Sequence, residues 1–111
     1  MLIAVISDTH LPRGARRLPE ERVVEAGGAR IAMVHDAGPR AGRLARLRAR
    51  FGDRADAVVF GHSHMPLHEQ GDDGFQILNP GSPTERRRAP EHTMGLIRVD
   101  SGLVTCEIVR A

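Results

Sequence analysis

Histidine and aspartate residues follow three apolar runs of this 111-residue chain, each time within a few residues of the end of the run. Imidazole and carboxylate groups together form the mixed nitrogen and oxygen donor set that suits Zn, Mn, Fe or Ni. The polar residues concerned are Asp8, His10, His35, His62 and His64. We therefore predict that these five residues form a divalent metal centre.

The spacing within two of these motifs favours convergence on one site. Residues i and i+2 of an extended segment point to the same face. Both histidines of Gly61-His62-Ser63-His64 have this spacing, and so do the aspartate and histidine of Asp8-Thr9-His10. The alternative for any single histidine is a hydrogen-bonded structural role at the end of a strand. We expect His68 and His92 to be structural or surface residues, because no ligand motif accompanies them.

The apolar runs that precede these motifs are Leu2–Ile6, Ile31–Val34 and Ala57–Phe60. Short, nearly continuous apolar runs are typical of strands that are covered on both faces. Open α/β sheets form their binding sites beyond the carboxyl ends of the strands, which is where the histidines and aspartates stand. We therefore expect a strand under each motif.

The rest of the chain predicts one helix and several hairpins. Apolar residues at positions 44, 47 and 51 lie on one face of a helix expected from Arg40 to Phe51. The arginines at 40, 43, 46, 48 and 50 are expected on its solvated face. Gly27-Gly28 predicts a hairpin turn between two extended runs. Further strands are expected at 66–70, 75–78, 94–99 and 103–109.

The order of these motifs, with Asn79-Pro80-Gly81-Ser82 after them, resembles the calcineurin-like metallophosphoesterase superfamily, in its small bacterial YfcE-type phosphodiesterase branch. The resemblance implies an α/β fold, an α/β/β/α sandwich, with a dinuclear centre. It assigns the first ion to Asp8, His10 and His64, and the second to His35 and His62. It also implies that Asn79, Gly81 and Ser82 lie beside the metals, where they contact substrate or only form a turn.

Two motifs of that family are missing from the chain. The family has a Gly-Asp pair, whose carboxylate bridges the metals, and a Gly-Asn motif before the strand that leads to the His35 equivalent. The Gly-Asp pairs of this chain, Gly52-Asp53 and Gly71-Asp72, both come after His35. A strand-helix region of roughly 50 to 60 residues is therefore absent, with a junction near residues 18–20. We expect a single domain over residues 1–111, with an incomplete sandwich and one ion instead of two.

The resemblance implies metal-dependent hydrolysis of a small phosphodiester or phosphomonoester by a metal-activated water. Without the bridging aspartate and the asparagine, we expect impaired activity. The alternatives are a non-catalytic interaction scaffold, the role that this superfamily fold has in the retromer complex, or an unstable deletion fragment. Loss of neighbouring strands should leave 2–6 and 57–60 partly uncovered, which favours a homo-oligomer.

Composition argues against other classes of partner. All 16 basic residues are arginine, but the net charge is only +2 and three phenylalanines are the only aromatic residues apart from histidine, so the stacking platform of single-strand binders is absent. No apolar run approaches the roughly 18 residues of a membrane span. The first run lacks a basic leader, which predicts a cytoplasmic protein. The single cysteine, Cys106, cannot form an internal disulfide.

Overall fold

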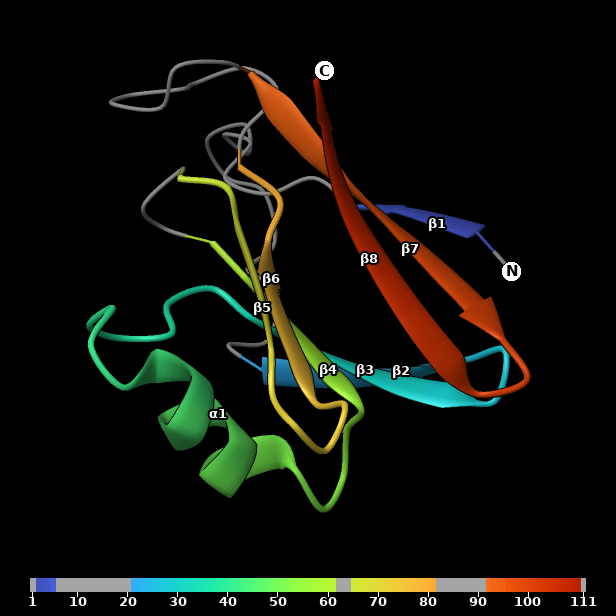
Figure 1. Ribbon diagram of the computed structural model, residues 1–111, viewed down its shortest axis with the longest axis horizontal. Helices are drawn as coiled ribbons and strands as arrows, with labels where there is room; N and C mark the ends of the chain where they lie inside the picture. Colours follow the sequence, from blue (N-terminus) through green and yellow to red (C-terminus); the bar gives the residue numbers. More distant parts are fainter. Residues whose placement is uncertain (1, 6–20, 62–64, 82–91, 111) are drawn as a thin grey trace, which may run out of the picture.

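The computed structural model describes residues 2–5, 21–61, 65–81 and 92–110, which form one helix and eight strands in two sheets (Figure 1). The mixed α/β fold expected from the sequence is confirmed. The elements are β1 (Leu2–Val5), β2 (Glu21–Ala26), β3 (Ala29–Val34), α1 (Arg43–Phe51), β4 (Ala57–Phe60), β5 (Leu67–Gln70), β6 (Gln76–Asn79), β7 (Thr93–Asp100) and β8 (Leu103–Arg110).

The larger sheet has five strands in the order β2-β3-β4-β6-β5. Its centre is parallel, because β3, β4 and β6 run in the same direction, while β2 and β5 pair antiparallel at the edges. The smaller sheet, β1-β7-β8, is antiparallel throughout. Three strands of the larger sheet therefore end at a common edge.

Two tight hairpin turns join the sheets at one corner of the molecule (Figure 1). Gly27 and Gly28 have φ of 57° and 87°, and Ser101 and Gly102 have φ of 51° and 83°. Two successive positive φ angles characterise the type I′ turn, which matches the twist of hairpin strands. The amide of Gly102 donates to the carbonyl of Gly27 at 3.1 Å, so the turns of the two sheets are bonded to each other.

The helix covers one face of the larger sheet. Leu47 and Phe51 are buried against Val58, Phe60 and Ile77, and Leu44 packs beside them. The apolar helix face predicted from the spacing of its residues is therefore confirmed. The helix begins at Arg43 rather than at Arg40, because Gly42 has a left-handed φ of 67° that no α-helix continues.

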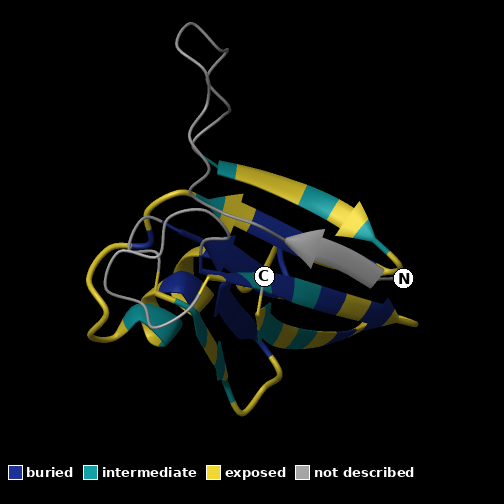
Figure 2. Cartoon of the chain, turned by 90° about the horizontal axis from the view of Figure 1, so that it is seen from above, coloured by how far each residue is buried: buried dark blue, intermediate teal, exposed yellow. Residues whose placement is uncertain are grey.

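The other face of the larger sheet packs on the smaller sheet. Ile31, Val59 and Leu78 meet Ile97 and Val99 in a second apolar cluster. Figure 2 shows the buried parts of the strands in dark blue, with exposed and intermediate residues alternating along the outer strands. The described part of the chain thus has three layers, helix on sheet on sheet, out of the four that the resemblance implies.

The central strand β4 is completely covered. Its four residues are between 0% and 6% exposed, because α1 lies on one side and the smaller sheet on the other. The expectation that 57–60 would be partly uncovered is wrong: β3 and β6 flank this strand on both edges. Across residues 21–61, 65–81 and 92–110, we find no helix long and apolar enough to cross a membrane.

Candidate metal centre

The carboxyl ends of β3, β4 and β6 lie side by side at one edge of the larger sheet. Val34 is level with Phe60, and Val59 is level with Leu78. The amide of Gly61 donates to the carbonyl of His35 at 2.9 Å. His35 therefore lies beside the residue that directly precedes His62.

The first strand belongs to the other sheet, yet it ends at the same end of the molecule. Val5 is opposite Gly95 near the start of β7, and the hydroxyl of Thr93 donates to the carbonyl of Pro80 at 2.8 Å, just after β6. Asp8 follows Val5 by three residues. The strands of both sheets that precede these motifs thus end at one end of the fold (Figure 1).

Of the five predicted ligands, the described residues include His35, which is exposed one residue beyond the end of β3. An exposed imidazole at this position fits the donor set of a divalent ion. The described ranges form no group of three or more histidine, cysteine, aspartate or glutamate side chains that could hold a metal. The predicted ligands Asp8, His10, His62 and His64, and the predicted substrate contact Ser82, lie outside those ranges.

The loop after β6 is stabilised by a hydrogen bond from within the loop itself. Asn79 is fully buried, and its Oδ1 accepts a hydrogen bond from the amide of Gly81 at 2.9 Å. Gly81 has φ of +73°, and a Cβ atom on it would lie 1.8 Å from Thr93 Oγ1. Only glycine fits this position. Both residues therefore form the turn, and their contact with a substrate stays a prediction.

Two arginines of α1 bond to the segment after His35. Arg46 donates to the carbonyls of Ala37 and Pro39, at 2.7 and 2.6 Å. Arg43 donates to another carbonyl of the same segment, and its guanidinium lies 4.8 Å from the centre of the Phe60 ring. Burial, followed by the nearby charge of Arg46, lowers the pKa of Arg43. Arg46 is exposed, as expected of a solvated helix face, and Arg43 is half-buried, but both also bond to the loop after His35.

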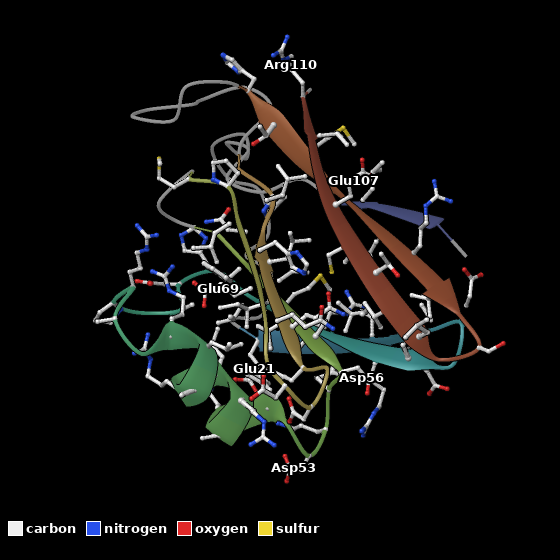
Figure 3. All side chains as sticks on the ribbon, viewed as in Figure 1. Glu21, Asp53, Asp56, Glu69, Glu107 and Arg110 are labelled. Atoms are coloured by element: carbon white, nitrogen blue, oxygen red, sulfur yellow. The ribbon has the colours of Figure 1, made fainter. Side chains whose placement is uncertain are left out.

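The sequence signal for this contact was present but weak. Arg43 and Arg46 are three residues apart and flank the apolar stripe, so they share the side of the helix that faces the preceding loop. Glu69 of β5 also lies close to this first turn of α1, where its charge raises the pKa of Arg43 against the effect of burial (Figure 3). The remaining helix arginines, Arg48 and Arg50, form ion pairs near the other end of the helix.

The two Gly-Asp pairs lie away from the candidate centre. Gly52 ends α1, where its amide donates to the carbonyl of Arg48 at 2.8 Å, and Asp53 follows at the far end of the molecule (Figure 3). Gly71 and Asp72 belong to the turn between β5 and β6. Both pairs precede the amino ends of parallel strands, so neither supplies a carboxylate at the carboxyl edge.

The two remaining histidines match the expectation of structural or surface residues. His68 is exposed on β5, and its Nε2 lies 2.8 Å from Oε1 of Gln76. The amide nitrogen of Gln76 in turn donates to the carbonyl of Val104 at 2.7 Å, which links the two sheets. His92 is exposed directly before β7.

Comparison with known proteins places the chain in a family. A protein of Methanothermobacter thermautotrophicus described as a probable metallophosphoesterase is 33% identical over 95 residues, which cover 83% of this chain and 53% of that protein. This chain therefore spans about half the length of the curated relative that it matches.

Solved structures share the fold. A predicted phosphoesterase from Streptococcus pneumoniae superposes with a TM-score of 0.67 at 22% identity, covering 86% of this chain and 56% of that one. Wild-type Vps29 from Entamoeba histolytica, complexed with Zn²⁺, superposes with a TM-score of 0.62 at 24% identity, covering 96% and 67%. The family model of the calcineurin-like phosphoesterase superfamily domain matches residues 11–102. The chain therefore belongs to the calcineurin-like phosphoesterase superfamily.

Proposed function

We propose that this chain is a metal-dependent phosphoesterase domain whose activity is impaired by the missing motifs. The observation that supports it best is the contact between the amide of Gly61 and the carbonyl of His35. This bond holds two strand ends together where two of the predicted ligand motifs begin. Membership of a family that uses divalent metals supports the same proposal.

The proposed ligands form two sets that differ in the number of ligands. Asp8, His10 and His64 would hold the first ion, as a two-histidine, one-carboxylate set. His35 and His62 alone would hold a second ion only weakly, because the sequence has no Gly-Asp pair before His35 to supply a bridging carboxylate. A bound divalent ion lowers the pKa of a water molecule and neutralises phosphoryl oxygens during in-line attack. With one strong set, we expect about one ion per chain and slow hydrolysis.

The proposed substrate is a small phosphodiester or phosphomonoester. The net charge of +2 favours an anionic ligand only mildly, so recognition would depend on groups near the centre. The loop with Asn79, Gly81 and Ser82 is our proposal for substrate contact, since β6 ends at the same edge as β3 and β4. Manganese is the ion that we propose to test first, with zinc and iron as alternatives.

The second candidate function is a non-catalytic interaction scaffold. The fold likeness to Vps29 and the absence of the Gly-Asp and Gly-Asn motifs before His35 favour this alternative. A scaffold would not need the histidine and aspartate motifs to bind metal. The Vps29 neighbour itself is complexed with Zn²⁺, so hydrolysis of a phosphoester, and not metal content, separates the two candidates.

Metal uptake tests the proposal directly. Elemental analysis of the purified chain should find roughly one Mn, Zn or Fe ion per molecule, and His64→Ala should lose most of it, because that imidazole belongs to the stronger set. His92→Ala is the matched control, since His92 is exposed and belongs to no motif. Metal content that His64→Ala leaves unchanged would remove the assignment of His64 as a ligand.

Hydrolysis of bis(p-nitrophenyl) phosphate with added Mn provides the second test. The chain should be far slower than a version in which the Gly-Asp and Gly-Asn segments are restored. Loss of one ion of a two-metal site removes several kcal/mol of transition-state stabilisation, and each 1.4 kcal/mol changes the rate about tenfold. Equal rates for the two proteins would show that the missing motifs are not needed.

A further inference from the structure

We propose that Arg46, with Arg43, is the positioning residue for His35. The two arginines of α1 hold loop 36–42, which connects His35 to the helix, against the end of β4. The inference rests on the proposed function only in that His35 is taken as a metal ligand. The holding of the loop itself follows from contacts between described residues.

Arg46 is bonded to three successive parts of this loop. Its Nη2 donates to the carbonyls of Ala37 and Pro39 at 2.7 and 2.6 Å, and its Nη1 donates to the carbonyl of Ala41 at 3.2 Å. Hydrogen bonds from a charged donor are stronger than neutral ones. The planar guanidinium presents its donors in a fixed fork, which a lysine ammonium cannot reproduce. One side chain therefore bonds to the loop at three points along its path.

Arg43 connects the same loop to β4. Its Nη2 donates to the carbonyl of Gly38 at 2.8 Å, and its guanidinium carbon lies 4.8 Å from the centre of the Phe60 ring. Phe60 is 2% exposed and is the last residue of β4, two positions before His62. The arginine thus joins the loop after one predicted ligand to the strand that leads to another.

The loop is shaped to receive these arginines. Gly38 has φ of +77°, and a Cβ atom there would approach Nη2 of Arg46 to 3.2 Å. Its amide donates to Oδ1 of Asp36 at 2.8 Å, and Ala37 is buried in the core beneath the helix. These contacts, together with the bond from the amide of Gly61 to the carbonyl of His35, hold the histidine on both sides.

A restrained backbone matters for a metal ligand because coordination requires the ring nitrogen at a defined position. Groups that orient a ligand without touching the metal commonly change metal affinity by about 10 to 100-fold when they are removed. His35 has only His62 as its proposed partner, so no further ligand compensates for a displaced ring. We therefore expect the weaker of two zinc-binding events to depend on Arg46.

The first experiment needs no metal. In the full chain, amide hydrogen exchange of Gly61, followed by NMR, reports the bond to the His35 carbonyl. Arg46→Met should make this exchange about tenfold faster or more, because three carbonyls lose a charged donor. Gly61 exchange should also be faster in Arg46→Lys than in the original chain. Because lysine keeps the positive charge, this variant shows the effect of losing the planar guanidinium fork alone. Arg48→Met is the control, since Arg48 bonds to Asp73 at the other end of the helix.

The second experiment measures zinc binding by calorimetric titration of the same proteins. Arg46→Met should weaken the weaker event about 10 to 100-fold, and should add nothing in a chain that already carries His35→Ala. Gly61 exchange that is unchanged in both Arg46 variants would overturn the inference. Zinc binding unaffected by His35→Ala, with accelerated Gly61 exchange, would instead refute His35 as a ligand and leave the holding of the loop supported.

Discussion

Replacement of Gly81 by alanine should destabilise the chain strongly, because this residue lacks room for even one methyl group. A Cβ atom would lie 1.8 Å from Oγ1 of Thr93 and 3.2 Å from its Cβ. The backbone φ of +73° also disfavours any side chain. The left-handed conformation costs alanine about 1–2 kcal/mol by itself.

The contact with Thr93 adds a second cost. To avoid the new methyl group, the hydroxyl must turn away from the carbonyl of Pro80, to which it now donates at 2.8 Å. A buried carbonyl left without its donor costs about 1–3 kcal/mol. The sum for Gly81→Ala is therefore about 2–5 kcal/mol, a large part of the 5–15 kcal/mol that holds a typical domain folded.

Denaturant unfolding of four proteins tests this reasoning. Thr93→Ala should cost about 1–3 kcal/mol, and in that background Gly81→Ala should cost only the backbone contribution of about 1–2 kcal/mol. Gly42→Ala is the matched control: Gly42 has φ of +67° and nothing within 4 Å of the added Cβ, so it shows the backbone cost alone. Additive costs in the double variant, or equal costs for Gly81→Ala and Gly42→Ala, would refute the steric argument.

Two further predictions concern the interior between the sheets. Gln76→Ala should lower the free energy of unfolding by about 1–3 kcal/mol, because the buried carbonyl of Val104 loses its donor. His68→Ala is the control and should lower it less, because His68 is exposed. Equal losses of the two variants in urea titrations would contradict this prediction. Burial raises the pKa of the Cys106 thiol from 9.0 to about 11, so its thiolate is about 100-fold scarcer at pH 8. Alkylation by iodoacetamide should therefore be roughly that much slower in the folded chain than in denaturant, and similar rates would show that the thiol is not shielded.

Much of the local structure could be predicted from the sequence. Gly27-Gly28 and Gly102 form the hairpin turns at which positive φ is needed, and the run Ala57–Phe60 is the fully buried strand that its composition indicates. The spacing of Leu47 and Phe51 identifies the buried face of α1. These features depend on neighbours along the chain, so periodicity and turn chemistry are enough to find them.

The family could also be predicted, because the motifs that carry the resemblance are present in the sequence. Histidine and aspartate at the ends of apolar runs indicate a metal centre whatever the exact sheet order. The family match over residues 11–102 agrees with the resemblance. The ligand set itself remains a prediction, with His35 as the member that the described residues place.

Only the tertiary structure decided how the elements combine. The sequence does not show that the first strand pairs with β7 in a separate sheet, or which elements cover the two faces of β4. The helix arginines likewise follow a solvated pattern, yet two of them hold the loop after His35.

The reason is that these contacts join residues far apart in the chain. Gly61 bonds to His35 across 26 positions, Gln76 to Val104 across 28, and Thr93 to Pro80 across 13. Hydrogen-bonding capacity belongs to every arginine, glutamine and backbone amide, so residue type alone does not select the partner. Packing of the two sheets and the helix brings particular donors and acceptors together, and the strand ends at the candidate centre meet for the same reason.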